Sequence, residues 1–135
     1  MRGDGRPRFV ADTHALLWDL FEPHRLSAAA RASLRLAWAG LAELWIPAIV
    51  LAEFDFACRK HRFPRVAKDL ITQARGSVNL HIAPLGDDLL LTFLELEQPA
   101  EMHDRMVAAE ALRLAAPVIT RDPALRALPF LETIW

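Results

Sequence analysis

Short apolar segments alternate with helical segments along almost the whole chain, and this alternation restricts the possible folds more than any other feature. The expected strands are residues 8–12, 44–46, 80–83, 117–120 and 131–135. Helical spacing and capping residues predict helices at 14–21, 28–39, 49–61, 64–76, 88–97, 104–115 and a helical turn at 123–127. Because crossover helices cover both faces of a parallel sheet, we expect an α/β fold, a three-layer α/β/α sandwich around a mainly parallel five-stranded sheet.

The length suits one domain. With 135 residues, 53% of them apolar, a folded chain can bury roughly two-thirds of the surface that it exposes when unfolded. We therefore expect a single domain over residues 8–135, preceded by a flexible tail over residues 1–7. Cys58 is the only cysteine, which excludes an internal disulfide and a cysteine-rich zinc site.

No membrane segment or targeting signal is expected. The polar start of the chain lacks the apolar stretch of a secretory signal. The longest apolar stretch, residues 36–54, contains Glu43, Pro47 and Glu53. Charges at mid-membrane cost ~2.5 to 3.5 kcal/mol each, and proline breaks a helix. Together with the single cysteine, this predicts a cytoplasmic protein.

Two acids directly follow expected strands. Asp12 ends the first strand, and Asp122 comes two residues after Thr120, which ends the fourth. In parallel α/β sheets, functional groups lie beyond the carboxyl ends of the strands. Asp104 begins the helix at 104–115 and is the third candidate. Each of these acids could instead cap the helix that follows it.

Glu53 stands out because its helical neighbours are apolar. Ile49, Val50, Phe56 and Ala57 lie three or four residues away from it. Burying a lone carboxylate costs several kcal/mol, so this acid must be neutralised, pair with a group such as a buried arginine, or bind a cation.

The other acids of the central and C-terminal parts are expected on solvated surfaces. Asp55 has Arg59 four residues on, which is a common pair on an exposed helix face. Glu110 has Arg113 three residues on, so we expect it at the surface or at the rim of a site. A solvated stretch is expected to hold Glu95, Glu97 and Glu101.

Four carboxylates in one crevice would repel one another unless a cation held them. Ligand sets of oxygen alone select hard ions such as Mg²⁺ or Mn²⁺. The five histidines are scattered, and no two have the helical spacing of zinc ligands. His103, next to Asp104, is the one closest to a candidate acid in the sequence.

The segments around these acids keep a recognisable order. They read VADTHALLW at 10–18, IVLAE at 49–53, HDRMVAA at 103–109, VITRD at 118–122 and TIW at 133–135. This series resembles the four acidic motifs and the usual ending of PIN domains, specifically of the toxin ribonucleases of VapBC toxin–antitoxin systems. The resemblance spans Phe9 to Trp135.

The resemblance implies a Mg²⁺- or Mn²⁺-dependent endoribonuclease that is inhibited by a cognate antitoxin and commonly forms a homodimer. Four tryptophans and seven phenylalanines in so small a chain also suggest that some aromatic surface meets another chain. The resemblance assigns metal binding and catalysis to Asp12, Glu53, Asp104 and Asp122, and supporting or phosphate-contacting hydroxyls to Thr13 and Thr120.

RNA has to approach these acids, which favours basic residues at the rim of the site. Ordinary solvated helix faces explain each basic residue equally well. The candidates for RNA binding are Arg59, Lys60, Arg62, Arg65, Lys68, Arg105 and Arg121.

Two other functions use similar residues. A housekeeping metal-dependent nuclease or a phosphatase could use the same acids on another phosphate ester. A non-catalytic phospho-acceptor signalling module also places acids beyond parallel strands, but it would need an acidic pair after the first strand and a lysine after the fifth. Asp12 has no acidic neighbour, and the only lysines are Lys60 and Lys68.

Overall fold

A five-stranded parallel sheet forms the centre of the molecule. The computed structural model describes residues 5–135. Its strand order is β3-β2-β1-β4-β5, and every neighbouring pair is parallel. The strands are β1 (Arg8–Ala11), β2 (Glu43–Pro47), β3 (Leu80–Ala83), β4 (Val118–Ile119) and β5 (Thr133–Ile134). The predicted α/β fold class is confirmed.

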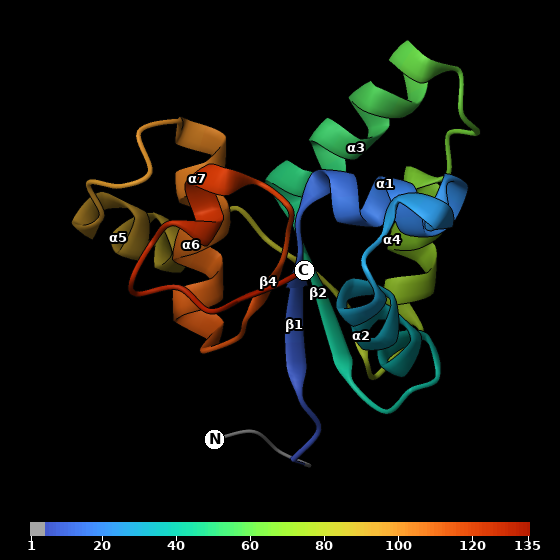
Figure 1. Ribbon diagram of the computed structural model, residues 1–135, viewed down its shortest axis with the longest axis horizontal. Helices are drawn as coiled ribbons and strands as arrows, with labels where there is room; N and C mark the ends of the chain where they lie inside the picture. Colours follow the sequence, from blue (N-terminus) through green and yellow to red (C-terminus); the bar gives the residue numbers. More distant parts are fainter. Residues whose placement is uncertain (1–4) are drawn as a thin grey trace.

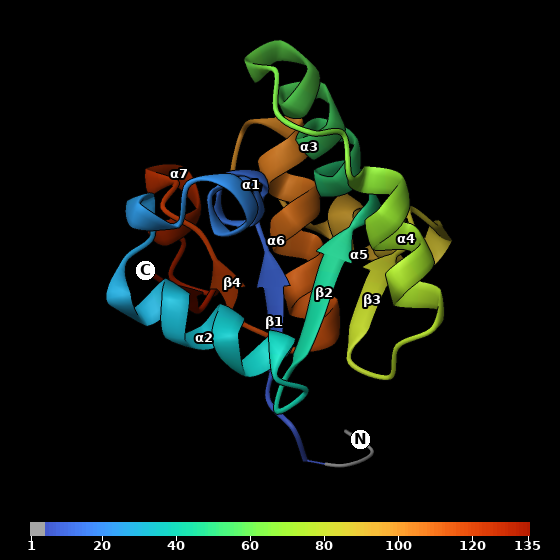
Figure 2. The same cartoon turned by 90° about the vertical axis from the view of Figure 1, so that its right-hand side faces the viewer.

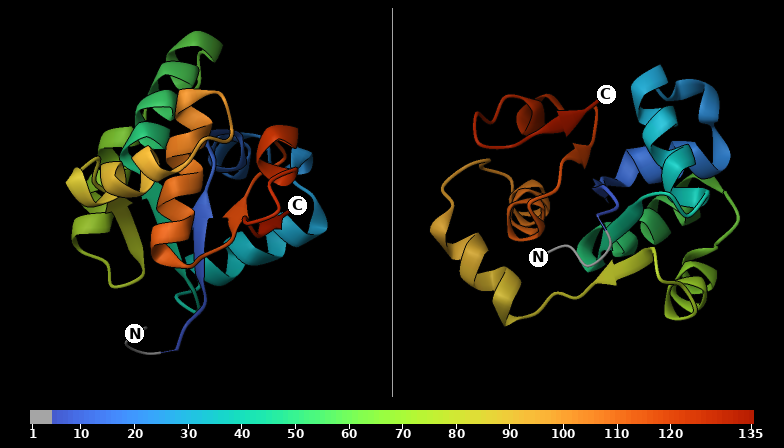
Figure 3. Two further views of the ribbon diagram at one scale, coloured as in Figure 1. Left: turned by 90° about the vertical axis from the view of Figure 1, so that its left-hand side faces the viewer. Right: turned by 90° about the horizontal axis from the view of Figure 1, so that it is seen from below.

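Helices cover both faces of this sheet. Figure 1 shows α1, α2 and α4 on one side of the sheet and α5 and α6 on the other, and the view from below in Figure 3 shows the same separation. Helix α3 projects beyond the carboxyl ends of β1 and β2 (Figure 2). The helices are α1 (Thr13–Phe21), η1 (Pro23–Arg25), α2 (Ala28–Trp38), α3 (Ala48–His61), α4 (Ala67–Arg75), α5 (Asp87–Glu95), α6 (Met102–Leu114) and α7 (Pro123–Arg126).

Residues 1–4 of the expected N-terminal tail lie outside the described residues. The carbonyl of Pro7 accepts a hydrogen bond from the Glu43 backbone N–H at 2.8 Å, next to the start of β1. Within residues 5–135, no helix has the length and apolar character needed to cross a bilayer.

Local signals explain several helix ends. The Ser27 hydroxyl accepts a hydrogen bond from the Ala30 N–H at 3.1 Å and caps α2 as expected. Gly40 follows α2 with a φ of 80°, a conformation in which a side chain is strained. Helix α4 begins at Ala67 rather than at Pro64, after a connector that Arg65 ties to α3.

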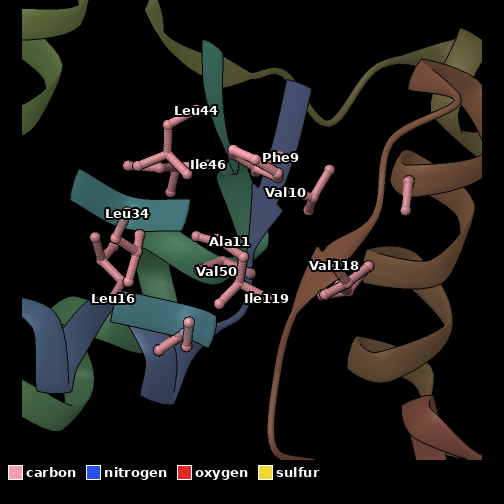
Figure 4. Packing of buried hydrophobic residues seen from close by; sticks show 14 of the residues in the cluster. Phe9, Val10, Ala11, Leu16, Leu34, Leu44, Ile46, Val50, Val118 and Ile119 are labelled. Atoms are coloured by element: carbon pink, nitrogen blue, oxygen red, sulfur yellow. The ribbon is translucent and has the colours of Figure 1, made fainter. Parts of the chain in front are cut away.

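The core lies on both faces of the sheet because side chains alternate along each strand. Leu44 and Ile46 of β2 pack with Leu16 of α1 and Leu34 of α2 on one face (Figure 4). Val10 points to the opposite face, towards α6. All of these side chains are almost completely buried.

Two acids are buried as ion pairs in this fold. Glu43 accepts hydrogen bonds from Arg8 Nε at 3.4 Å and lies 3.0 Å from His81 Nε2. The prediction that Glu110 lies at the surface or at the rim of a site is wrong, because its side chain is 0% exposed. Helix α6 packs between β1 and α5, so both of its sides are covered. Arg113 compensates the charge, donating from Nε at 2.7 Å and from a terminal nitrogen at 3.0 Å.

We expect Arg113→Ala to destabilise the protein by about 3 kcal/mol, because it leaves the Glu110 carboxylate buried without its partner. Urea unfolding measures the loss. Arg126→Ala, an exposed arginine of α7, is the matched control and should stay within about 0.5 kcal/mol of the parent. The double variant Glu110→Met/Arg113→Ala should recover most of the loss. Equal stability of Arg113→Ala and Arg126→Ala would contradict the role of this pair.

Candidate functional site

Asp12 is held at the end of β1 by bonds to both of its carboxylate oxygens. Oδ1 accepts from the Thr13 backbone N–H at 2.8 Å, and Oδ2 accepts from the Thr120 hydroxyl at 2.7 Å. The side chain is 9% exposed. Capping of α1 therefore explains only the hydrogen bond to Oδ1. The other connects the carboxyl end of β1 to the residue that follows β4.

Thr120 also positions Asp122. Its buried hydroxyl accepts a hydrogen bond from the Asp122 backbone N–H at 3.0 Å while it donates to Asp12. Asp122 Oδ1 accepts from the Ala124 N–H at 2.9 Å and so caps α7. The capping role considered for Asp122 is therefore present, and the same residue also borders the pocket described below.

Glu53 extends from α3 towards the same place. Its Oε1 accepts a hydrogen bond from the Thr13 hydroxyl at 3.3 Å. No lysine or arginine of the described part of the chain forms an ion pair with it, so the buried arginine considered as a partner is not found. Its apolar neighbours are not all core residues either. Phe56 is 72% exposed, and with Ala57 it forms a wall of the pocket.

Asp104 lies in the first turn of α6 and does not cap that helix. The helix begins at Met102, two residues earlier than expected, and Glu101 is the cap. Glu101 Oε2 accepts from the Asp104 backbone N–H at 2.8 Å, while its Oε1 lies 2.7 Å from His103 Nδ1. Because another residue supplies the cap, capping does not explain the acid at Asp104.

These four acids border one pocket of about 470 Å³ at the carboxyl edge of the sheet. Helices α1, α3 and α6 gather there, beyond the arrowheads of β1 and β2 (Figure 2). We call this the acid pocket. It is lined by Asp12, Thr13, His14, Glu53, Phe56, Ala57, Lys60, His61, His103, Asp104 and Asp122.

Burial and mutual repulsion shift the proton affinities in the acid pocket. Burial, followed by the charges of Asp122 and Asp12, raises the pKa of Asp104 to about 7. Burial also raises the pKa of Asp12, although its hydrogen bonds from Thr120 and Thr13 oppose this. Burial raises the pKa of Glu53, with His103 opposing. Shifts of this kind are typical of functional sites.

The donor chemistry suits a hydrated hard cation. Within residues 5–135, no three His, Cys, Asp or Glu side chains form a group that could hold a metal ion together. Mg²⁺, however, keeps several waters and commonly binds through only one or two carboxylates. The pKa of His103 is raised, first by its hydrogen bond to Glu101.

The predicted basic residues divide according to their partners. Arg65 donates to both oxygens of Asp55, at 3.1 and 3.0 Å, so the pairing expected between Asp55 and Arg59 gives way to a longer-range one. Arg105 donates to the carbonyls of Pro99 at 2.7 Å and Ala100 at 3.3 Å and holds the loop before α6. These two arginines therefore have structural partners.

The remaining predicted basic residues are exposed, but only two of them border the acid pocket or the pocket that adjoins it. Lys60 lines the acid pocket. Arg121 lines a second, adjoining pocket of about 420 Å³, formed by Asp12, His14, Trp18, Arg25, Arg121, Asp122 and Pro123. Arg59, Arg62 and Lys68 line neither.

Sequence reasoning did not find Arg25, Trp18 or Glu101. Arg25 lies in the short helix η1, where its nearest acid, Glu22 at 3.4 Å, suggests an ordinary surface pair. Trp18 has the helical spacing of a core residue. Of these three residues, only Glu101 could have been recognised from the sequence. It stands three residues before Asp104, which is the spacing of a helix cap to the backbone N–H that it accepts from.

Solved structures with a similar fold include a toxin–antitoxin complex and a toxin. VapBC2 of Rickettsia felis, bound to a promoter DNA fragment, matches with a TM-score of 0.65, 18% identity and coverage of 93% of this chain and 96% of that one. A toxin–antitoxin complex of Klebsiella pneumoniae matches with a TM-score of 0.64 and 20% identity, and the match covers 92% of this chain and 95% of that one. VapC20 of Mycobacterium tuberculosis is described as a sarcin-ricin-loop-cleaving toxin. It matches with a TM-score of 0.62 and 20% identity, and the match covers 92% of this chain and 97% of that one.

Sequence comparison identifies the family directly. No curated protein sequence matches this chain significantly. The sequence profile of the PIN domain, however, matches residues 9–131. That span includes all four acids of the acid pocket, the whole of β2, β3 and β4, and all of β1 except Arg8, which confirms the resemblance to PIN domains. The chain belongs to the PIN domain family.

Proposed function

We propose that this protein is a metal-dependent endoribonuclease and the toxin of a toxin–antitoxin pair. One observation supports this most strongly: four carboxylates from separate elements, Asp12, Glu53, Asp104 and Asp122, line one pocket, and no arginine or lysine within residues 5–135 forms an ion pair with them. A structural set of buried acids would have such partners, as Glu43 and Glu110 do.

A bound Mg²⁺ or Mn²⁺ would supply a Lewis acid that polarises the phosphate and lowers the pKa of a coordinated water. One or two of the carboxylates of Asp12, Glu53, Asp104 and Asp122 would bind that ion directly, and the others would bind the waters that it keeps. The Thr120 hydroxyl orients the Asp12 carboxylate, and the Thr13 hydroxyl orients Glu53. Groups of this kind fix the direction of metal ligands and tune their affinity.

RNA is the substrate that the surroundings support best. The acid pocket opens beside Lys60 and adjoins a second pocket that contains Arg25 and Arg121, which suits a polyanion longer than a single phosphate ester. VapC20, which shares the fold, is described as cleaving an RNA loop. A phospho-acceptor role is disfavoured because both oxygens of the buried Asp12 are engaged in hydrogen bonds.

An antitoxin partner and a second copy of this chain complete the proposal. Structural neighbours include toxin–antitoxin complexes. Exposed apolar side chains gather on α5, at Leu90, Leu91 and Leu94, and in a monomer they would face water. We place both interactions in the cytoplasm, where the single buried Cys58 stays reduced.

Purified protein should cleave single-stranded or loop RNA with Mg²⁺ or Mn²⁺ and stop when EDTA is added. Asp12→Asn should abolish cleavage, and Thr120→Val should lower it 10- to 100-fold, roughly, because Asp12 loses its orienting bond. Gel analysis of labelled RNA, single-stranded DNA and a phosphate monoester measures this. Arg126→Ala is the control and should match the parent. Robust cleavage by Asp12→Asn in EDTA would contradict the metal mechanism, and a preference for DNA or the monoester would favour the alternative enzymes.

Asp104→Asn should leave the metal-free protein at least as stable as the parent at pH 8. The folded protein binds the Asp104 proton more tightly than the unfolded chain does, because its pKa is about 7 instead of 3.8. The stability that this group contributes is therefore full below about pH 4 and is lost as the pH rises to about 7. The asparagine variant avoids that loss, so the stabilities of the two proteins should become equal near pH 4. Thermal unfolding in EDTA over this pH range measures the difference.

Mg²⁺ provides the second half of that test. The parent should gain RT ln(1 + [L]/Kd), about 1.4 kcal/mol at ten times Kd, and Asp104→Asn should gain much less. A variant that is clearly less stable in EDTA at pH 8, and that gains as much from Mg²⁺ as the parent, would assign Asp104 a purely structural role.

Light scattering at tens of micromolar protein, roughly, should give the mass of a dimer, because association would bury the apolar side chains of α5. Leu91→Asp should shift the mass towards the monomer, whereas Leu41→Asp, an equally apolar exposed residue away from α5, should not. A monomeric mass for the parent would remove the homodimer from the proposal.

A further inference from the structure

A second pocket adjoins the acid pocket, and it contains the opposite charge. The two pockets share Asp12, His14 and Asp122 along their common border. Beyond that border, the second pocket is lined by Arg25 and Arg121, and both guanidinium groups contact the ring of Trp18. A ligand in one pocket therefore lies directly beside a ligand in the other.

Trp18 is a fixed platform for these arginines. Its side chain is 5% exposed, and its ring packs against His14 at 5.4 Å and Trp135 at 5.8 Å between ring centroids. The guanidinium of Arg25 lies 4.4 Å from the centroid of the Trp18 ring, and that of Arg121 lies 5.0 Å away. Cation–π contacts and a planar guanidinium reduce the freedom that each side chain loses when it binds an anion.

The hydrogen-bond donors of these two arginines remain largely available. Arg25 has one long contact, 3.4 Å to the exposed Glu22. Arg121 makes no hydrogen bond or ion pair with any residue in the part of the chain that the structure describes. By contrast, Arg65, Arg105 and Arg113 each donate two hydrogen bonds to protein acceptors.

We propose that Arg25 and Arg121, supported by Trp18, form a clamp for an RNA backbone phosphate that neighbours the cleaved one. This inference rests on the proposed ribonuclease function. Guanidinium groups bind phosphate through paired, charge-assisted hydrogen bonds. RNA carries its phosphates in regular succession, so a phosphate at the acid pocket brings the next one to the clamp. An acidic peptide has no such reason to extend from the clamp into a pocket of carboxylates.

The clamp is tested by removing the charge of an arginine in the protein and, separately, the charge of a phosphate in the RNA. The probe is a short single-stranded oligoribonucleotide, together with versions in which one linkage at a time is an uncharged methylphosphonate. Anisotropy in EDTA measures binding at several salt concentrations, and gel assays with Mg²⁺ measure cleavage. The proteins are the parent, Arg25→Ala, Arg121→Ala and the matched control Arg126→Ala, whose arginine lies on α7 outside both pockets.

Arg25→Ala and Arg121→Ala should each weaken binding about tenfold and reduce the slope of log affinity against log salt by about 0.7. Arg126→Ala should change neither. One methylphosphonate next to the cleaved linkage should weaken RNA binding by the parent by the same factor. It should not weaken RNA binding by Arg121→Ala any further. If an alanine variant fails to unfold cooperatively, Arg→Gln at that position takes its place, since it keeps much of the side-chain stem over Trp18.

The outcomes separate the clamp from the proposed function. If the parent cleaves RNA but both clamp variants bind it as Arg126→Ala does, the clamp is wrong and the ribonuclease function stands. If the clamp variants keep RNA binding but lose binding to a glutamate-rich peptide, the anion is a protein carboxylate and the proposal is overturned. If RNA binding depends on the clamp but the parent does not cleave with Mg²⁺, the clamp stands and the ribonuclease function fails.

Discussion

The hydrogen bond from the Thr120 hydroxyl to Asp12, 2.7 Å long and spanning 108 residues, is the interaction on which the candidate site depends. It joins the carboxyl ends of two neighbouring parallel strands. The same hydroxyl accepts from the Asp122 N–H, so one buried oxygen positions two acids. This arrangement is possible because parallel pairing of β1 with β4 aligns Ala11 with Ile119, which puts Asp12 and Thr120 at the same edge of the sheet. The acids from α3 and α6 approach that edge from the two helical layers.

Buried acids in this protein are accommodated in two different ways, and the contrast separates structure from function. Glu43 and Glu110 have arginine partners, which offset the cost of removing a carboxylate from water. The acids of the acid pocket lack such partners in the described residues, and burial together with mutual repulsion raises the pKa of Asp12, Glu53 and, most clearly, Asp104. A fold gains no stability from such an arrangement. A bound cation would compensate this repulsion, which is why the unpaired acids, and not the paired ones, indicate a site.

Much of the candidate site could be predicted from the order of short motifs, because Asp12, Asp104 and Asp122 stand at strand or helix ends that local signals define. Predictions based on helical neighbours were less secure. Of the apolar residues around Glu53, Phe56 and Ala57 line an open pocket, with Phe56 largely exposed, and in the apparent surface pair of Glu110 with Arg113 the glutamate is buried. A helical pattern shows which residues share a face, but not whether another element covers that face. For α6 the answer depends on α5, and for α3 on its projection beyond the sheet (Figure 1).

By itself, the sequence determined the alternation of strands and helices, the parallel α/β class and the identity of the four acids, because hydrophobic period, capping residues and motif order are properties of neighbouring residues. Only the tertiary structure decided which charges meet. Asp55 pairs with Arg65 instead of Arg59, Glu101 rather than Asp104 caps α6, and Arg25 and Arg121 converge on Trp18 from elements far apart in the chain. These contacts depend on how the helices cross the sheet, and the crossing is set by the packing of the whole core, which no local stretch of sequence contains.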